Sequence, residues 1–124
     1  MATTQPFHGL KVLDFMWAAV GPLTSRYLSE HGATVVKIES MYHPDITRTT
    51  PPYLGRQPSV NRSHLLAEVN ANKLSLGINL NKPQGVELAR RIITTWQPDV
   101  LCENFTPRAM KKWGLDYPLV RRLK

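Results

Sequence analysis

The stretch Lys11-Val-Leu-Asp-Phe15 is a short apolar run that follows a glycine, and it predicts a buried β-strand. Gly21-Pro22 ends this run and suits the first turn of a helix, which we expect to continue to about His31. Thr34-Val-Val-Lys-Ile-Glu39 is rich in β-branched residues and predicts a second strand. The interval of about 23 residues is typical of a right-handed crossover between parallel strands.

The helix expected between these strands has one apolar face. Leu23, Tyr27 and Leu28 are spaced as neighbours on a helix, so we expect them to face the sheet. Residues 40–62, which follow the second strand, are crowded with proline, glycine, threonine and serine. They predict a long proline-rich loop, and a loop of this length in a compact domain is usually functional or mobile.

The second half of the chain continues the alternation of strands and helices. The expected elements are strands at 73–80 and 99–105, with helices at 63–69, 83–96, 107–113 and from residue 117 onward. In the first of these strands, the alternating apolar residues should share one side; they are Leu74, Leu76, Ile78 and Leu80. Such alternation predicts an α/β fold with a mostly parallel sheet and helices on both faces.

Length and composition fit one ordinary globular domain. The chain has 124 residues, of which 42% are hydrophobic and 20% charged. No run approaches the roughly 20 apolar residues that span a bilayer, and the first residues lack the pattern of a secretory signal. The single cysteine, Cys102, cannot form an internal disulfide, which favours a reducing cytoplasm.

The formal charge of +7 is concentrated near the end of the chain. Residues 108–124 carry six basic side chains against Asp116 alone. Such a segment suits a nucleic acid, a phosphorylated ligand or an unbalanced surface, and the charge alone does not choose among them.

Common catalytic and nucleotide-binding motifs are missing from the sequence. Neither a Gly-x-Gly-x-x-Gly fingerprint nor a P-loop is present, and Cys102 lies inside a predicted strand as a small core residue. The histidines are scattered without a second ligand at metal spacing, so we expect no metal site; they are His8, His31, His43 and His64.

Two features place a ligand at the carboxyl ends of the predicted strands. Gly21-Pro22 begins a helix after the first strand, and backbone N–H groups at such a start can receive a phosphate. Asn104 and Phe105 follow the strand at 99–105, where open parallel sheets bind their ligands. The alternative is a structural role, with Asn104 as a loop cap and Phe105 as a core edge.

Beyond these features, several segments in order resemble family III CoA-transferases, which include the formyl-CoA and carnitine CoA-transferase types and share a superfamily with α-methylacyl-CoA racemases. The resemblance covers about residues 8–123. Its segments are Gly9–Phe15, Ala19–Pro22, Leu28–Glu39, Asp45–Arg48, Asn72–Leu80, Lys82–Gly85, Asp99–Pro107 and Met110–Tyr117.

The resemblance implies that residues 1–124 form the N-terminal, CoA-binding part of a larger Rossmann-like domain. The substrates would be a CoA thioester and a carboxylic acid, and coenzyme A would be bound without a metal. The family implies an interlocked homodimer. From the cysteine count and the lack of a membrane-spanning run we also expect a cytoplasmic location, with neither nucleic acid nor membrane as partner. A chain cut within its last predicted helix would also be prone to self-association.

The resemblance also assigns CoA contacts. Ala18 and Ala19 match the turn that faces the pantetheine and the active site, and Ile78 matches a position near the adenine. Asn104 and Phe105 match the Asn-Phe pair beside CoA in the family.

Two further positions carry charge. Lys112 matches a position where an arginine commonly meets a CoA phosphate, and Arg48 lies on the loop near the substrate. Three positions depart from the family pattern: Ser40 replaces a polar or basic CoA contact, Leu74 replaces a basic residue, and Trp17 belongs to a less polar turn than that of the formyl-CoA type.

The resemblance predicts that the catalytic aspartate lies downstream of Lys124. Transferases of this family use an aspartate that the donor thioester acylates, which suits a carboxylate nucleophile. The aspartates that do not match it are Asp14, Asp45, Asp99 and Asp116. The histidine and aspartate of the racemases also lie downstream, so we nominate no catalytic residue and expect this chain alone to be inactive.

Three functions therefore remain open at the level of sequence. The first is the CoA-binding part of an acyl-CoA:carboxylate CoA-transferase, favoured by Glu103-Asn104-Phe105. The second is the same part of an α-methylacyl-CoA racemase. The third is a non-catalytic nucleotide- or nucleic-acid-binding module that uses the basic segment, which should then show aromatic residues interleaved with its charges.

Overall fold

The computed structural model describes residues 4–123, which form a four-stranded sheet. The strands are β1 (Lys11–Asp14), β2 (Thr34–Glu39), β3 (Leu74–Gly77) and β4 (Val100–Cys102). Their order in the sheet is β3-β2-β1-β4, and each neighbouring pair is parallel. The predicted α/β fold with a parallel sheet is confirmed.

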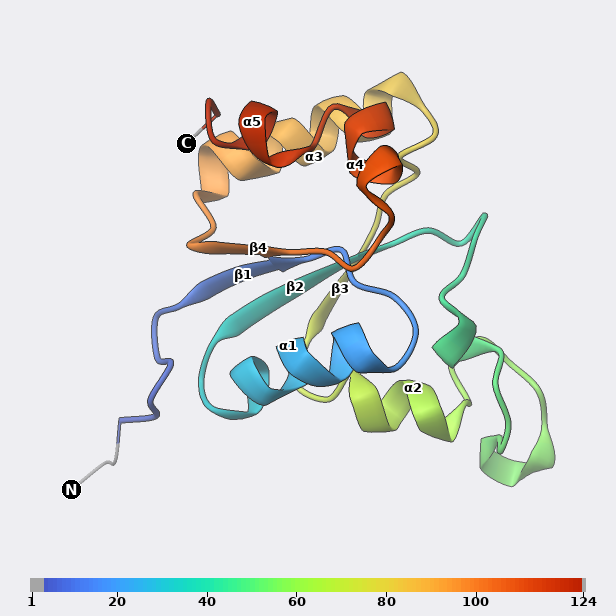
Figure 1. The fold of residues 1–124 in the computed structure, drawn as a ribbon. Coiled ribbons are helices and arrows are strands. Elements are labelled where there is room, and N and C mark those ends of the chain that lie inside the picture. Colours follow the sequence, from blue (N-terminus) through green and yellow to red (C-terminus); the bar gives the residue numbers. More distant parts are fainter. Residues whose placement is uncertain (1–3, 124) are drawn as a thin grey trace.

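Helices cover both faces of this sheet, as the sequence predicts (Figure 1). One face carries α1 (Val20–Glu30) and α2 (His64–Val69). The opposite face carries α3 (Pro83–Trp96), α4 (Pro107–Trp113) and α5 (Tyr117–Val120). Within the loop at 40–62 the chain forms two short 3₁₀ turns, η1 (Ile46–Arg48) and η2 (Leu54–Arg56).

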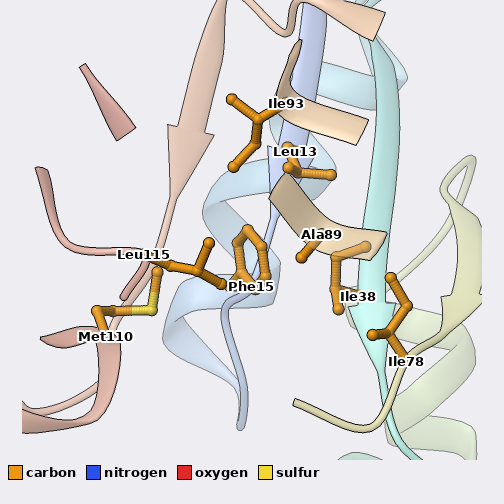
Figure 2. Close-up of a cluster of buried hydrophobic side chains, with 8 residues drawn as sticks. All are labelled: Leu13, Phe15, Ile38, Ile78, Ala89, Ile93, Met110 and Leu115. Carbon is orange, nitrogen blue, oxygen red and sulfur yellow. The ribbon is translucent and has the colours of Figure 1, made fainter. Parts of the chain in front are cut away.

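The larger apolar core lies between the sheet and the α3 layer (Figure 2). Alternate residues of β1 and β2 point toward α3, because successive side chains of a strand face opposite sides of the sheet. The buried residues are Leu13, Phe15, Ile38, Ile78, Ala89, Ile93, Met110 and Leu115. Burial of each large side chain contributes about 1.5–3 kcal/mol to folding. This core therefore fixes α3 and α4 against the sheet.

The face under α1 differs from the prediction, because α1 buries small and polar residues there. Its buried positions are Gly21, Pro22, Ser25 and Ser29. The predicted inward residues Leu23 and Tyr27 are instead 53% and 57% exposed. The physical reason lies in the sheet, which presents the charged side chains Asp14 and Lys37 toward this helix. The Ser25 hydroxyl donates to Asp14 Oδ2, a hydrogen bond that leucine at this position could not make.

Two strands are shorter than predicted. β3 ends at Gly77, so that Ile78 follows the strand, and β4 spans only Val100–Cys102. Leu74 is 61% exposed and does not share the burial of Ile78. β3 is an edge strand, with β2 as its neighbour on one side. The alternating pattern therefore overestimates the length of the buried strand.

The helices of residues 4–123 are all too short or too polar to cross a membrane. The basic residues of the C-terminal segment lie mostly on exposed positions of α4 and the turn after α5, while Lys124 lies outside the described residues.

Candidate functional site

A cavity of about 250 Å³ opens at the carboxyl ends of the strands. Every strand of the sheet contributes the residue or residues that follow its C-terminal end. The lining residues are Phe15, Trp17, Ile38, Glu39, Ser40, His43, Ile78, Asn79, Leu80, Asn81, Phe105 and Trp113. Ligands of open parallel sheets bind at this edge. The cavity is therefore the candidate ligand site of the fold.

Three aromatic rings stand together in this lining. The centroid of the Phe105 ring lies 5.5 Å from that of Trp17 and 5.4 Å from that of Trp113, both in edge-to-face geometry. The Trp113 indole N–H donates to Asn81 Oδ1 at 3.4 Å. A mostly apolar cavity with a few amide groups suits a flat heteroaromatic ring, because the rings supply contact area and the amides supply orientation.

Two of the predicted contact residues line the cavity directly. Ile78 is buried immediately after β3, and Phe105 lies three residues beyond Cys102, the last residue of β4. Their positions follow from the strand ends, which the sheet brings to one edge. The adenine contact at Ile78 stays a prediction, and the place of Ile78 in the lining is compatible with it.

The other predicted contacts lie on the turn between β1 and α1 or beside it. Ala18 and Ala19 are exposed, next to the described lining of the cavity rather than in it. The Ala18 N–H donates to Asp45 Oδ1 at 3.1 Å, so it is already engaged. Asn104 uses its amide in the same region: it accepts from Trp17 N and donates to Trp17 O, both at 2.9 Å.

Lys112 lies on an exposed position of α4, close to the cavity but outside its lining. It lines a second hollow of about 400 Å³ together with Lys82 of the loop before α3. This hollow shares Leu80, Asn81 and Trp113 with the cavity, so the two are neighbours. An anionic group attached to a ligand in the cavity would therefore meet two ammonium groups.

Arg48 forms a bidentate ion pair with Glu39, a residue of the cavity lining. Its Nε and Nη2 donate to the two carboxylate oxygens at 2.6 and 2.7 Å, and both side chains are largely buried. Burial alone would raise the pKa of Glu39, but the hydrogen bonds and charge of Arg48 outweigh it and lower that pKa. The hydrogen bond to Glu39 raises the pKa of Arg48. The pair anchors the loop at 40–62 to the end of β2.

Two further ion pairs lie buried under the β1–α1 turn. Lys37 Nζ is 3.1 Å from Asp45 Oδ2, and Lys73 Nζ is 3.3 Å from Asp14 Oδ2. Ser25 Oγ also donates to Asp14 Oδ2 at 2.5 Å. Burial lowers the pKa of Lys73 to about 8, against the opposing attraction of Asp14. These buried charges are paired, as the cost of burying an isolated charge requires.

Sequence reasoning missed several of these residues. The sequence assigned neither Trp17 nor Trp113 to a ligand contact, and both line the cavity. The position of Trp17 two residues after the predicted first strand is a signal that could have marked it. The buried ion pairs of Lys37, Asp45 and Lys73 are harder to predict from the sequence. A charged residue within an apolar run can either face solvent or be buried in an ion pair.

The described residues offer neither a group of metal ligands nor a reactive thiol. Within residues 4–123 no three side chains of histidine, cysteine, aspartate or glutamate gather as a group that could hold a metal ion. Cys102 is half-buried in β4 and packs beside the smaller apolar cluster of Val12, Ala33 and Val35. Burial raises the pKa of its thiol, which opposes formation of the nucleophilic thiolate.

The fold is an α/β fold with a parallel sheet, and its cavity lies at the carboxyl edge of that sheet. The sequence matches the model of CoA-transferase family III over residues 7–124, and the chain belongs to that family.

Named relatives agree with this assignment. The chain is 33% identical over 118 residues to human succinyl-CoA:glutarate CoA-transferase, which covers 94% of this chain and 25% of that protein. It is 38% identical over 117 residues to acetyl-CoA:oxalate CoA-transferase of Acetobacter aceti, which covers 90% of this chain and 27% of that protein. The chain thus spans about a quarter of the length of these relatives.

A solved structure shows the same fold. The crystal structure of a CAIB/BAIF family protein from Brucella suis superposes with a TM-score of 0.85 at 32% sequence identity. The match covers 98% of this chain and 32% of that one. The four-stranded sheet and its helices are accordingly part of a larger domain in that protein.

Proposed function

We propose that this chain is the N-terminal, CoA-binding part of an acyl-CoA:carboxylate CoA-transferase. The cavity at the carboxyl edge of the sheet carries the proposal, because a member of a CoA-transferring family needs a place for the nucleotide end of CoA. The wider proposal includes a cytoplasmic homodimer whose substrates are a CoA thioester and a carboxylic acid.

The lining offers a physical basis for holding the adenine ring. Ile78 supplies an apolar surface, while Phe105 and its two tryptophan neighbours supply aromatic contact area. Asn79 and Asn81 can exchange hydrogen bonds with ring nitrogens. Adenine in this cavity would place its ribose and phosphates toward the neighbouring hollow that contains Lys82 and Lys112.

The chemistry of acyl transfer needs a carboxylate that a thioester can reach. Asp14 and Asp45 are buried in ion pairs, and both Glu39 oxygens bind Arg48. These engagements oppose a nucleophilic role for these three carboxylates. We therefore propose that the nucleophile comes from outside these residues and that this chain alone transfers no acyl group.

The test of the CoA site is a calorimetric titration of CoA into the wild type and two neighbouring variants. Ser40→Trp places a large side chain at a residue that lines the cavity. Met41→Trp is the matched control, since Met41 is 66% exposed and lies next in sequence. We expect Ser40→Trp to weaken CoA binding at least tenfold while Met41→Trp leaves it within about twofold.

Equal CoA affinities in the two variants, or an absence of CoA binding by the wild type, would refute the proposed site. The proposal of inactivity is tested separately with an acyl-CoA donor and a carboxylic acid acceptor, and turnover by this chain alone would refute it. The names of the relatives favour the transferase over the racemase. Tight, steeply salt-dependent binding of duplex DNA with no CoA binding would instead support the nucleic-acid module.

A further inference from the structure

Three consecutive backbone N–H groups of the β1–α1 turn each donate to a side chain from a different part of the chain. Met16 N donates to Asp14 Oδ1 at 2.8 Å, Trp17 N to Asn104 Oδ1 at 2.9 Å, and Ala18 N to Asp45 Oδ1 at 3.1 Å. The acceptors belong to β1, to the residues after β4 and to the loop at 40–62. We call these three side chains the turn clamp.

The Asn104 side-chain amide binds both backbone polar groups of Trp17. Its Oδ1 accepts from Trp17 N while its Nδ2 donates to Trp17 O at 2.9 Å. Gly21 provides the space for this contact, because a Cβ built on Gly21 would lie 2.9 Å from Asn104 Nδ2. A larger residue at position 21 would therefore collide with the Asn104 amide. This steric observation is independent of the hydrogen bonds.

Asp45 is itself fixed from below. Its Oδ1 also accepts from Thr47 N at 3.0 Å, and its Oδ2 is paired with Lys37. The Lys37 ammonium donates to Met16 O, so the same cation reaches the turn directly. The side chain of Asp45 is only 1% exposed, which separates it from any ligand in the cavity.

The turn needs such a clamp because its backbone is unfavourable. Ala18 has a φ of +62°, in the left-handed region that residues other than glycine seldom adopt and that costs about 1–2 kcal/mol. Strained conformations of this kind persist where the surrounding structure over-determines them. Trp17, the residue before it, projects its ring into the cavity lining against Phe105.

We propose that Asn104 and Asp45 are positioning residues that fix the turn at residues 16–18 and thereby the direction of the Trp17 ring. This inference rests on the proposed function, since the ligand whose affinity it sets is CoA. Asn104 acts through the Trp17 backbone, and Asp45 acts from beneath the turn without contact to the ligand.

The experiment combines amide hydrogen exchange by NMR with calorimetric CoA binding, under conditions where thermal melts show each variant folded. Asn104→Ala and Asp45→Ala each remove one part of the turn clamp. Asn61→Ala is the control, because Asn61 accepts a hydrogen bond from Arg48 in the same loop, while the amides of residues 16–18 donate to other side chains. Asp45→Asn keeps the acceptor Oδ1 and serves as the conservative variant.

We expect the Trp17 amide in Asn104→Ala and the Ala18 amide in Asp45→Ala to exchange at least tenfold faster than in the wild type. Both variants should bind CoA about tenfold more weakly, whereas Asn61→Ala matches the wild type. Asp45→Asn should restore slow exchange at Ala18. A purely structural role would lower the melting temperature and leave CoA affinity unchanged in the folded variants.

Unchanged CoA affinity in the folded clamp variants would overturn the inference, and so would two other outcomes. One is unchanged exchange at residues 16–18 in both clamp variants. The other is weakened CoA binding in Asn104→Ala alone, which would make Asn104 a direct ligand contact and leave Asp45 without a role. A wild type that binds no CoA refutes the proposed function instead, and the exchange rates still decide whether the clamp exists.

Discussion

Arg48→Met removes the cation from the ion pair that ties the loop at 40–62 to β2. Glu39 would then keep the Ser75 hydroxyl, which donates at 2.9 Å, but would lose both bonds from the guanidinium. Removal of one partner from a buried ion pair costs about 3–5 kcal/mol, because it leaves an uncompensated charge. The pair retains slight exposure, so we expect the lower end, about 3 kcal/mol at pH 7.

The pH dependence of this loss identifies its cause. The lowered pKa of Glu39 stabilises the wild type above the unfolded pKa of about 4.3, and this contribution disappears as the pH falls through the folded pKa. Without Arg48, burial dominates and raises the pKa of Glu39 instead. The variant's deficit should therefore be full at pH 7 and shrink toward pH 4, where Glu39 becomes neutral.

Urea unfolding of four proteins measures the effect: the wild type, Arg48→Met, Glu39→Gln and the double variant. We expect the double variant to be more stable than Arg48→Met, since removal of both charges leaves none unpaired. A loss below about 1 kcal/mol for Arg48→Met, or a deficit that does not change between pH 7 and pH 4, would refute the reasoning.

Three other predictions concern the packing and the buried charges. Gly85→Ala should cost about 2–3 kcal/mol in urea unfolding, because its Cβ would collide with the backbone carbonyl of Asn79; a neutral effect would contradict this contact. The Lys73 side chain should titrate by NMR with a pKa of about 8, so the free energy of unfolding should rise from about pH 8 to 10.5 as the unfolded state binds the extra proton; a midpoint near 10.5 would exclude the burial effect. Leu23→Ser should change stability by less than about 0.5 kcal/mol while Ser25→Leu costs about 1–3 kcal/mol, and the reverse order in thermal melts would show that α1 buries its apolar face.

Periodicity predicted the elements of this fold well where apolar residues decide the packing. The strand at Thr34–Glu39 and the helices at 83–96 and 107–113 have the predicted bounds, because their buried faces pack on the large core. Periodicity failed at α1, where the buried Ser25 donates to Asp14 of the sheet and the buried Ser29 donates to Ala71 O. The spacing of apolar residues does not indicate where charged side chains are buried together.

The candidate site was predictable only in part. The positions of Ile78 and Phe105 at the ends of strands follow from the topology of parallel sheets. The turn clamp does not, because Asn104 and Asp45 are 87 and 27 residues from the backbone atoms that they bind. Such pairings depend on the relative placement of loops, which local sequence patterns do not encode.

The central claim is that CoA binds in the cavity at the carboxyl edge of the sheet, and NMR chemical-shift mapping with CoA tests it most directly. The account predicts saturable shifts at Trp17, Ile78, Phe105 and Trp113, with further shifts near Lys112. Another hollow lies elsewhere on the molecule and is lined by residues that include Leu101, Pro107 and Tyr117. Shifts confined to that hollow, or an absence of shifts at millimolar CoA, would contradict the account.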